Sequence, residues 1–200
     1  MATSESTSFN MDIDEIITEA YERCGLEVRS GYDLKTARRS LNLMFSEWAN
    51  RGINLWLIEE RSKTLSASLA EYTLGKDLID IMEAAITKSS KDYRVERISR
   101  AAYLSFTDKT STGRPTQFYL QRSVTPKIFF YPTPDSTSTY TFKFHALTRI
   151  QDAGDDYTND PDVPFRFLPC LISGLAYYLA MKFNPDKMLV LKQIYDEEWT

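Results

Sequence analysis

The chain has 200 residues, a formal net charge of -4 at pH 7, and 42% hydrophobic and 26% charged residues. This composition is typical of a folded globular protein and excludes a wholly disordered chain. The mildly acidic balance excludes a global basic field that would attract DNA or an anionic membrane. Two cysteines are too few for a disulfide scaffold. Since the sequence contains neither a membrane-spanning apolar run nor a secretion signal, we expect a cytosolic protein or a part of something assembled in a cytosol.

The first predicted element is a short amphipathic helix that starts after Asn10 and ends at Gly25. Asn10 is the predicted N-cap, and the acids that follow it favour the positive end of the helix dipole. Apolar residues recur at spacings of three and four, which places them on one face. They are Ile13, Ile16, Ile17, Ala20 and either Tyr21 or Cys24.

The second predicted helix leads directly into a strand, and this junction organises the chain. Asp33 is the predicted cap, and Gly52 follows the last turn, where a left-handed residue is needed. The apolar face of the helix consists of Leu34, Ala37, Leu41, Phe45 and Trp48. From residue 53 the pattern alternates, with Ile53, Leu55 and Leu57 on one side and Asn54, Trp56 and Ile58 on the other. We expect Trp48 and Trp56 to be core residues.

The segment 62–106 gives shorter signals. Residues 62–74 predict two strands joined by a turn. Residues 78–87 (LIDIMEAAIT) fit either a helix or a strand. A strand is favoured because 89–92 resembles a hairpin turn that leads into Tyr93 and Val95. Residues 99–106 predict a short helix capped by Ser99.

The next part of the chain has β character after a loop at 108–115 (DKTSTGRP). Three strands are predicted at 117–121, 127–131 and 139–147, with a proline corner at 132–135 between the last two. The last strand alternates most regularly. Together the three predict an antiparallel meander.

The C-terminal part predicts an exposed acidic loop at 150–163 and then two helices. Asp162 is the predicted cap of the first, which carries a wide apolar face and is expected to be the most buried helix. A new helix begins at 184–186, with Met188, Leu191, Tyr195 and Trp199 on its apolar face. The chain is thus predicted to be α+β: an antiparallel helical bundle (1–52 and 163–200) with an inserted antiparallel β-sheet or sandwich (53–162).

Residues suited to catalysis or metal binding are few. His145, the one histidine, lies on the polar side of a predicted strand and is expected at the surface, so no zinc site is predicted. No phosphate-binding glycine loop or dinucleotide motif is present. Paired carboxylates such as Glu59 and Glu60 remain possible catalytic groups, although a solvated surface is favoured. The acidic loop at 152–162 could bind calcium, but its spacing does not fit the EF-hand pattern, so a solvated loop is favoured. We therefore predict no catalytic residue, metal or cofactor.

Arginines and aromatic residues suggest assembly instead. Arg38, Arg39, Arg51 and Arg61 gather near the central junction, but interleaved acids favour ion pairs or subunit contacts over nucleic-acid binding. Twelve tyrosines and an aromatic content of 13% are high for a solvated monomer. Such residues are favoured at protein interfaces.

Three stretches resemble a known family, the head-to-tail adaptors of short-tailed bacteriophages (the tail tubular protein A group). The first is TARRSLNLMFSEWANRGINLWLIEE, from Thr36 to Glu60. The second is VPFRFLPCLISGLAYYLAMKFNPD, from Val163 to Asp186, and the third is TGRPTQFYLQR…PKIFFYPTPDSTSTYTFKF, between Thr112 and Phe144. The resemblance covers nearly the whole chain except residues 62–111.

The resemblance implies a virion structural protein of the tail and neck, assembled in the host cytoplasm. Its copies would form a ring, typically of twelve, between the portal and the tail nozzle, through which DNA passes without sequence-specific binding. The helices would pack subunit against subunit, and the β part would face the nozzle. The predicted portal contacts are Met188, Tyr195 and Trp199, and the predicted subunit-interface residues are Arg38, Arg39, Arg51 and Trp56. The loop at 108–115 or the acidic loop would face the next ring or the tail fibres.

Two other functions stay open from the sequence. One branch of these adaptors is reported to cleave peptidoglycan, so an adaptor with hydrolase activity is the main alternative. A capsid-associated DNA-binding protein is a third reading, and the net charge disfavours it.

Overall fold

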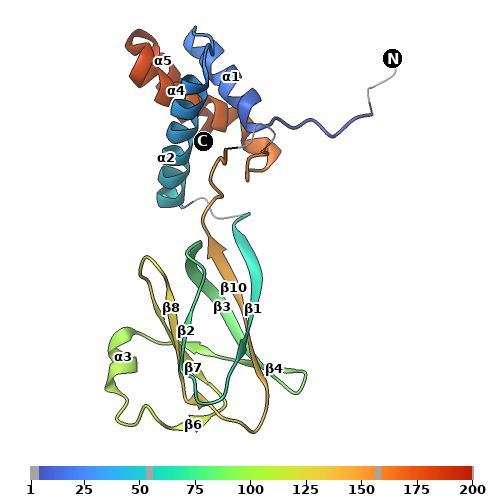
Figure 1. The fold of residues 1–200 in the computed structure, drawn as a ribbon, viewed down its shortest axis with the longest axis vertical. Coiled ribbons are helices and arrows are strands. Elements are labelled where there is room, and N and C mark those ends of the chain that lie inside the picture. The colour runs from blue at the N-terminus through green and yellow to red at the C-terminus, as the bar shows by residue number, and fades with distance from the viewer. Residues whose placement is uncertain (1–4, 53–55, 156–158, 200) are drawn as a thin grey trace. The chain divides into compact units, whose positions relative to one another are not determined.

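The computed structural model describes residues 5–52, 56–155 and 159–199 (Figure 1). The chain divides into two compact units. The helical unit comprises Met1–Ile53 and Ile150–Thr200, and the β unit comprises Asn54–Arg149. The predicted α+β class is confirmed.

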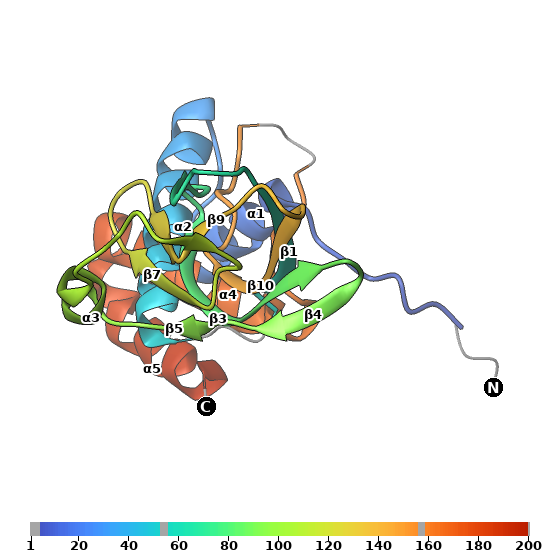
Figure 2. The same ribbon diagram turned by 90° about the horizontal axis from the view of Figure 1, so that it is seen from below.

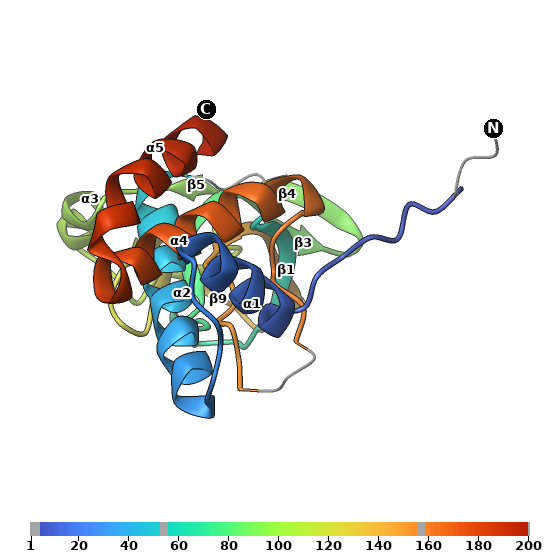
Figure 3. The same ribbon diagram turned by 90° about the horizontal axis from the view of Figure 1, so that it is seen from above.

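The helical unit is built around one buried helix. Its α-helices are α1 (Ile13–Cys24), α2 (Gly31–Arg51), α4 (Leu168–Phe183) and α5 (Met188–Trp199), with 3-10 turns η1 (Phe165–Phe167) and η2 (Pro185–Lys187). Helix α4 packs against α1, α2 and α5 (Figure 3). The prediction that this helix is the most buried is confirmed, because its residues from Leu171 to Ala176 are buried without a break. An apolar helix surrounded by neighbours on several sides needs no polar face.

The ends of the first two helices agree with the sequence prediction, but their starts do not. Gly25 and Gly52 follow α1 and α2 in the left-handed conformation, at φ 72° and 82°. The N-cap of α1 is Asp12 rather than Asn10, because the Asp12 carboxylate accepts the Glu15 N–H at 2.8 Å in a capping box.

Two further predicted caps, Asp33 and Asp162, are also wrong. Helix α2 begins after Ser30, and Asp33 lies at its third position, where its carboxylate closes a capping box onto the Ser30 N–H at 3.1 Å. Asp162 does not cap α4. Its carboxylate accepts the Gln151 N–H at 3.2 Å, and the helix begins only after the 3-10 turn η1.

The strand predicted after Gly52 begins later than expected. Strand β1 (Ile58–Leu65) starts where its pairing with β10 starts, at the Ile58–Leu147 pair. Trp56 and Leu57 therefore lie in a turn, and residues 53–55 fall outside the described residues. Trp48 is fully buried, as predicted, whereas Trp56 is only half-buried.

The β unit contains two four-stranded sheets (Figure 2). Sheet A has the order β1, β10 (Tyr140–Thr148), β3 (Leu78–Lys88), β4 (Lys91–Arg94). Sheet B has the order β2 (Glu71–Thr73), β8 (Lys127–Tyr131), β7 (Gln117–Gln121), β5 (Glu96–Arg97). A short parallel pair joins β6 (Thr112–Gly113) to β9 (Thr133–Pro134), and helix α3 spans Arg100–Ser105.

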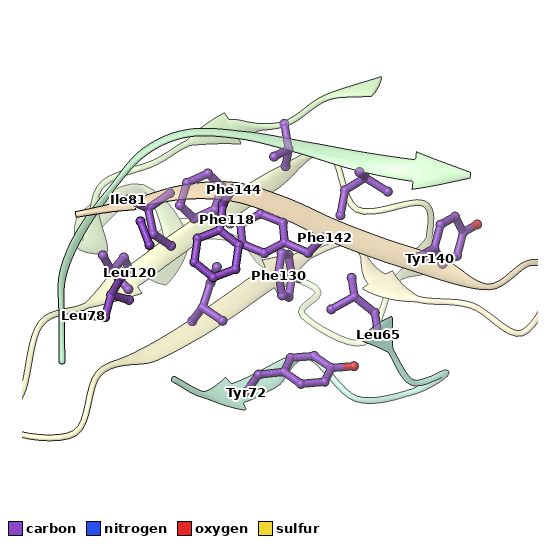
Figure 4. Close-up of a cluster of buried hydrophobic side chains, with 14 residues drawn as sticks. Leu65, Tyr72, Leu78, Ile81, Phe118, Leu120, Phe130, Tyr140, Phe142 and Phe144 are labelled. Carbon is purple, nitrogen blue, oxygen red and sulfur yellow. The ribbon is translucent and has the colours of Figure 1, made fainter. Parts of the chain in front are cut away.

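Aromatic side chains from both sheets form one core, which makes the β unit a sandwich (Figure 4). Phe142 of β10 lies in its centre, with ring centroids 4.9 Å from Phe130 and 5.5 Å from Phe118. Both contacts are edge-to-face, the arrangement that ring quadrupoles favour. The alternation of β10 thus points its aromatic residues at the opposite sheet.

Some predicted strands are confirmed, but their pairing is not a meander. Strand β3 and its hairpin into β4 form as favoured, and Ser99 caps α3 through the Ala102 N–H at 3.1 Å. Strands β7 and β8 pair antiparallel, but β10 leaves them and inserts between β1 and β3 of sheet A. Two flanking strands give β10 a partner on each edge, a long-range pairing that a local pattern does not reveal. The predicted loop at 108–115 and the proline corner contribute β6 and β9.

The segment that follows β10 is not a wholly exposed loop as predicted. Ile150 and Ala153 are buried, at 3% and 2% exposure. The Asn42 side-chain oxygen accepts the Ala153 N–H at 2.8 Å, which fixes this segment against α2. The unit boundary accordingly follows Arg149, whereas the sequence pattern places it after residue 162.

Candidate interaction surfaces

A cluster of aromatic side chains closes the helical unit where α2 and α5 meet. Trp48 donates its indole N–H to the Tyr195 hydroxyl at 2.8 Å, and both side chains are buried. Trp199 lies edge-on to Trp48, with ring centroids 5.3 Å apart, and Phe167 lies 6.5 Å from Trp48. Burial raises the pKa of Tyr195 to about 12, so this phenol stays protonated at neutral pH. We call these four residues the aromatic cluster.

Charged groups cover the edge of the aromatic cluster. The Arg51 guanidinium lies over the Trp199 ring, 4.5 Å from its centroid, and pairs with Glu47 one turn earlier. Glu47 also accepts a hydrogen bond from the Tyr178 hydroxyl at 2.6 Å. Burial and the neighbouring Glu47 raise the pKa of Tyr178. Arg51 is therefore held within its own chain.

The three residues predicted to contact the portal have different surroundings. Tyr195 is only 1% exposed and belongs to the core. Met188 and Trp199 are half-buried. The exposed apolar residues of α5 lie on its other side and were missed by the sequence reasoning: Leu189, Val190 and Ile194, at 73%, 61% and 37% exposure. Their signal was present, since Val190 and Ile194 are four residues apart on a face that Leu191 and Tyr195 do not share. We call these three residues the α5 outer strip.

The residues predicted at a subunit interface also differ in their surroundings. Arg38 pairs with Asp14 of α1 at 2.7 Å and donates to the Asp155 carbonyl at 2.6 Å, so it joins parts of the same helical unit. Arg39 is exposed on the outer face of α2, whereas Trp56 is half-buried in the turn before β1.

The residues considered for chemistry lie at neighbouring exposed positions of sheet A. His145 is exposed on β10, opposite Glu60 of β1. Glu59 is exposed and pairs with Arg61. Within the described residues, no group of three or more potential metal ligands is close enough to hold an ion. In the same residues, no helix is long and apolar enough to cross a membrane.

Among the hollows on the helical unit, two follow charged helix faces. A groove of about 740 Å³ follows α2 and is lined by Lys35, Arg38, Arg39, Leu43, Asp152 and Asp155 among others. A shallower hollow of about 480 Å³ follows α1 and is lined by Phe9, Met11, Glu15, Thr18, Glu19 and Glu22 among others. The first has a basic and apolar wall on α2 and two acids, Asp152 and Asp155, on the opposite wall, whereas the second combines acidic and apolar groups.

The exposed apolar residues of α5 suit a contact with another protein. The sequence model of the SU10 adaptor protein family matches residues 11–198 of this chain. The chain belongs to this family, which confirms the resemblance to bacteriophage adaptors predicted from the sequence. It is accordingly a bacteriophage adaptor, a structural protein of the virion tail and neck. No curated protein sequence matches the chain.

Proposed function

We propose that this protein forms a ring between the portal of the capsid and the tail nozzle, and that DNA leaves the capsid through this ring. The observation that carries the proposal is the family match, which includes both the helical unit and the β unit. A ring of twelve copies is the expected number. The net charge of -4 suits a channel, because like charge keeps DNA from adhering to the wall.

In this proposal, the helical unit carries the contacts between copies and with the portal. The β unit is a sandwich closed by its own aromatic core, and it faces the nozzle or the tail fibres. We place the portal contact on the α5 outer strip rather than on Tyr195, since Tyr195 is buried inside the chain. Exposed aliphatic side chains grouped on one helix suit a helix-in-groove contact.

Electron microscopy of the purified chain mixed with portal rings of the same phage tests the proposal. We expect an added layer of density with the symmetry of the portal. The paired variant Leu189→Asp/Val190→Asp is expected to lose that layer while keeping the fold, because both positions are exposed and lie in the first turn, where acids are tolerated. Val124→Asp is the matched control, since Val124 is an exposed aliphatic residue of the β unit at 89% exposure. A paired variant that binds as well as wild type would exclude the α5 outer strip.

A peptidoglycan hydrolase activity is the alternative that the family resemblance left open. Such chemistry commonly uses two carboxyl groups, one of them held in a site that raises its pKa. Glu59 and Glu60, the adjacent acids considered from the sequence, lie on an exposed strand, and Glu59 pairs with Arg61. Turnover of purified cell wall by the isolated chain would establish this activity.

A further inference from the structure

The outer faces of α1 and α2 carry opposite charge. Between the cap of α1 and its last residue, the chain has five acids and one arginine: Asp12, Asp14, Glu15, Glu19 and Glu22 against Arg23. Glu15 and Glu22 are exposed, and Glu19 lies at their side with a 38% exposed side chain. We call Glu15, Glu19 and Glu22 the α1 acidic face.

The middle of α2 has the complementary charge. From residue 34 to residue 46 the helix has three bases and no acid. Arg38 forms an ion pair with Asp14 of the same chain, but Lys35 and Arg39 lie one turn apart on the exposed side of α2. The acids of α2 serve elsewhere: Asp33 closes the N-terminal capping box, and Glu47 pairs with Arg51. Asp152 and Asp155 line the other wall of the adjoining groove. We call Lys35 and Arg39 the α2 basic face.

Each charged face also has exposed apolar side chains next to it. Tyr32 and Leu43, at 73% and 57% exposure, lie on the same side of α2 as Lys35 and Arg39. On α1, the acidic hollow of about 480 Å³ is bordered by Phe9, which is 72% exposed. Stable protein contacts need such apolar anchors, while the surrounding charges set the orientation and the choice of partner.

The pattern selects which faces meet. Two α1 acidic faces repel each other, and so do two α2 basic faces, so the favourable contact joins an acidic face to a basic face. Two different, complementary faces on one chain allow a head-to-tail contact, which generates a closed ring when the rotation closes. We propose that the α1 acidic face of one copy binds the α2 basic face of the next copy. This inference rests on the proposed ring assembly, to which it adds the contact between neighbours.

A charge-reversal experiment tests the pairing. The variant Lys35→Glu/Arg39→Glu has two acidic faces, and the variant Glu19→Lys/Glu22→Lys has two basic faces. Each alone is expected to self-associate about tenfold more weakly than wild type, the change that corresponds to about 1.4 kcal/mol. An equimolar mixture restores both opposite-charge contacts and is expected to recover the wild-type association. Sedimentation velocity at low and high ionic strength measures this, because exposed charges are screened by salt.

The substitutions are chosen to leave the helices intact. Glu and Lys have similar helix propensities. The Glu19–Arg23 ion pair, which the substitution removes, is partly exposed and contributes little to the free energy of unfolding. Glu15 is left unchanged because its carboxylate belongs to the capping box of α1. The control Lys76→Glu/Lys91→Glu makes the same change in net charge as Lys35→Glu/Arg39→Glu, at exposed positions of the β unit, and is expected to associate like wild type. Circular dichroism confirms that each variant is folded.

Several results would overturn the pairing. It fails if the mixture associates no better than its components, or if the wild-type chain shows no salt-sensitive association at its highest soluble concentration. It also fails if Lys35→Glu/Arg39→Glu abolishes only the retention of duplex DNA, since the α2 basic face would then be a DNA contact. Portal binding is measured separately, so copies that associate by this pairing but do not bind the portal would refute the proposed function alone.

Discussion

The hydrogen bond between Trp48 and Tyr195 joins the second helix of the chain to the last one, and removing it has a calculable cost. In Tyr195→Phe the ring keeps its packing but loses the hydroxyl that accepts the Trp48 indole N–H at 2.8 Å. Since Trp48 is fully buried, water cannot replace that acceptor. An unsatisfied buried donor costs about 1–3 kcal/mol, and we expect a loss of this size in the unfolding free energy of the helical unit.

Urea unfolding followed by tryptophan fluorescence measures this effect, because Trp48 and Trp199 both lie in the aromatic cluster. Tyr32→Phe is the matched control: Tyr32 is 73% exposed on α2, so removing its hydroxyl is expected to change the unfolding free energy by less than about 0.5 kcal/mol. A Tyr195→Phe variant as stable as the control would show that the bond does not tie α5 to α2.

Three other perturbations follow from the structure. A methyl group at Gly174 would approach the Met44 sulfur at 2.5 Å and the Tyr195 ring at 2.8 Å, so Gly174→Ala is expected to lower the melting temperature despite its better helix propensity, by overpacking worth about 1–3 kcal/mol. The folded-state pKa of Tyr195 is raised from 10.0 to about 12, so its contribution to stability is complete below pH 10 and is lost as pH rises to 12. Tyr195→Phe should therefore flatten the decline of melting temperature in that window, and an unchanged decline would contradict the assignment. Ser89 and Ser90 form the β3–β4 turn with φ of 49° and 62°, so Ser89→Asn/Ser90→Gly is expected to stabilise the β unit by about 1 kcal/mol, and a lower denaturation midpoint would refute this.

The sequence predicted those elements whose signals are local. The two glycine helix ends, the buried face with Trp48, and the β3–β4 hairpin all follow from spacing and turn chemistry within a few residues. The predictions of the helix caps failed because several neighbouring residues have side chains that can cap a helix. Only one carboxylate reaches the right N–H, as that of Asp12 does for α1. The prediction of a meander failed because β10 pairs with strands that lie more than fifty residues earlier in the chain.

The site residues were harder to predict for a different reason. Met188, Tyr195 and Trp199 were predicted to contact the portal because the family resemblance docks the C-terminal helix there. The same apolar spacing also describes a face that packs on its own chain. Only the packing of α5 against α4 distinguishes that buried side from the α5 outer strip. Arg38 was likewise predicted at a subunit interface, but the fold brings Asp14 of the same chain beside it.

The measurement that tests the account most directly is electron microscopy of this chain with portal rings of its own phage. We expect an extra ring of density with the symmetry of the portal, in which the α1 acidic face of each copy meets the α2 basic face of the next. A folded chain that leaves the portal bare would contradict the proposed adaptor function. A ring whose copies meet through other surfaces would contradict the charge pairing.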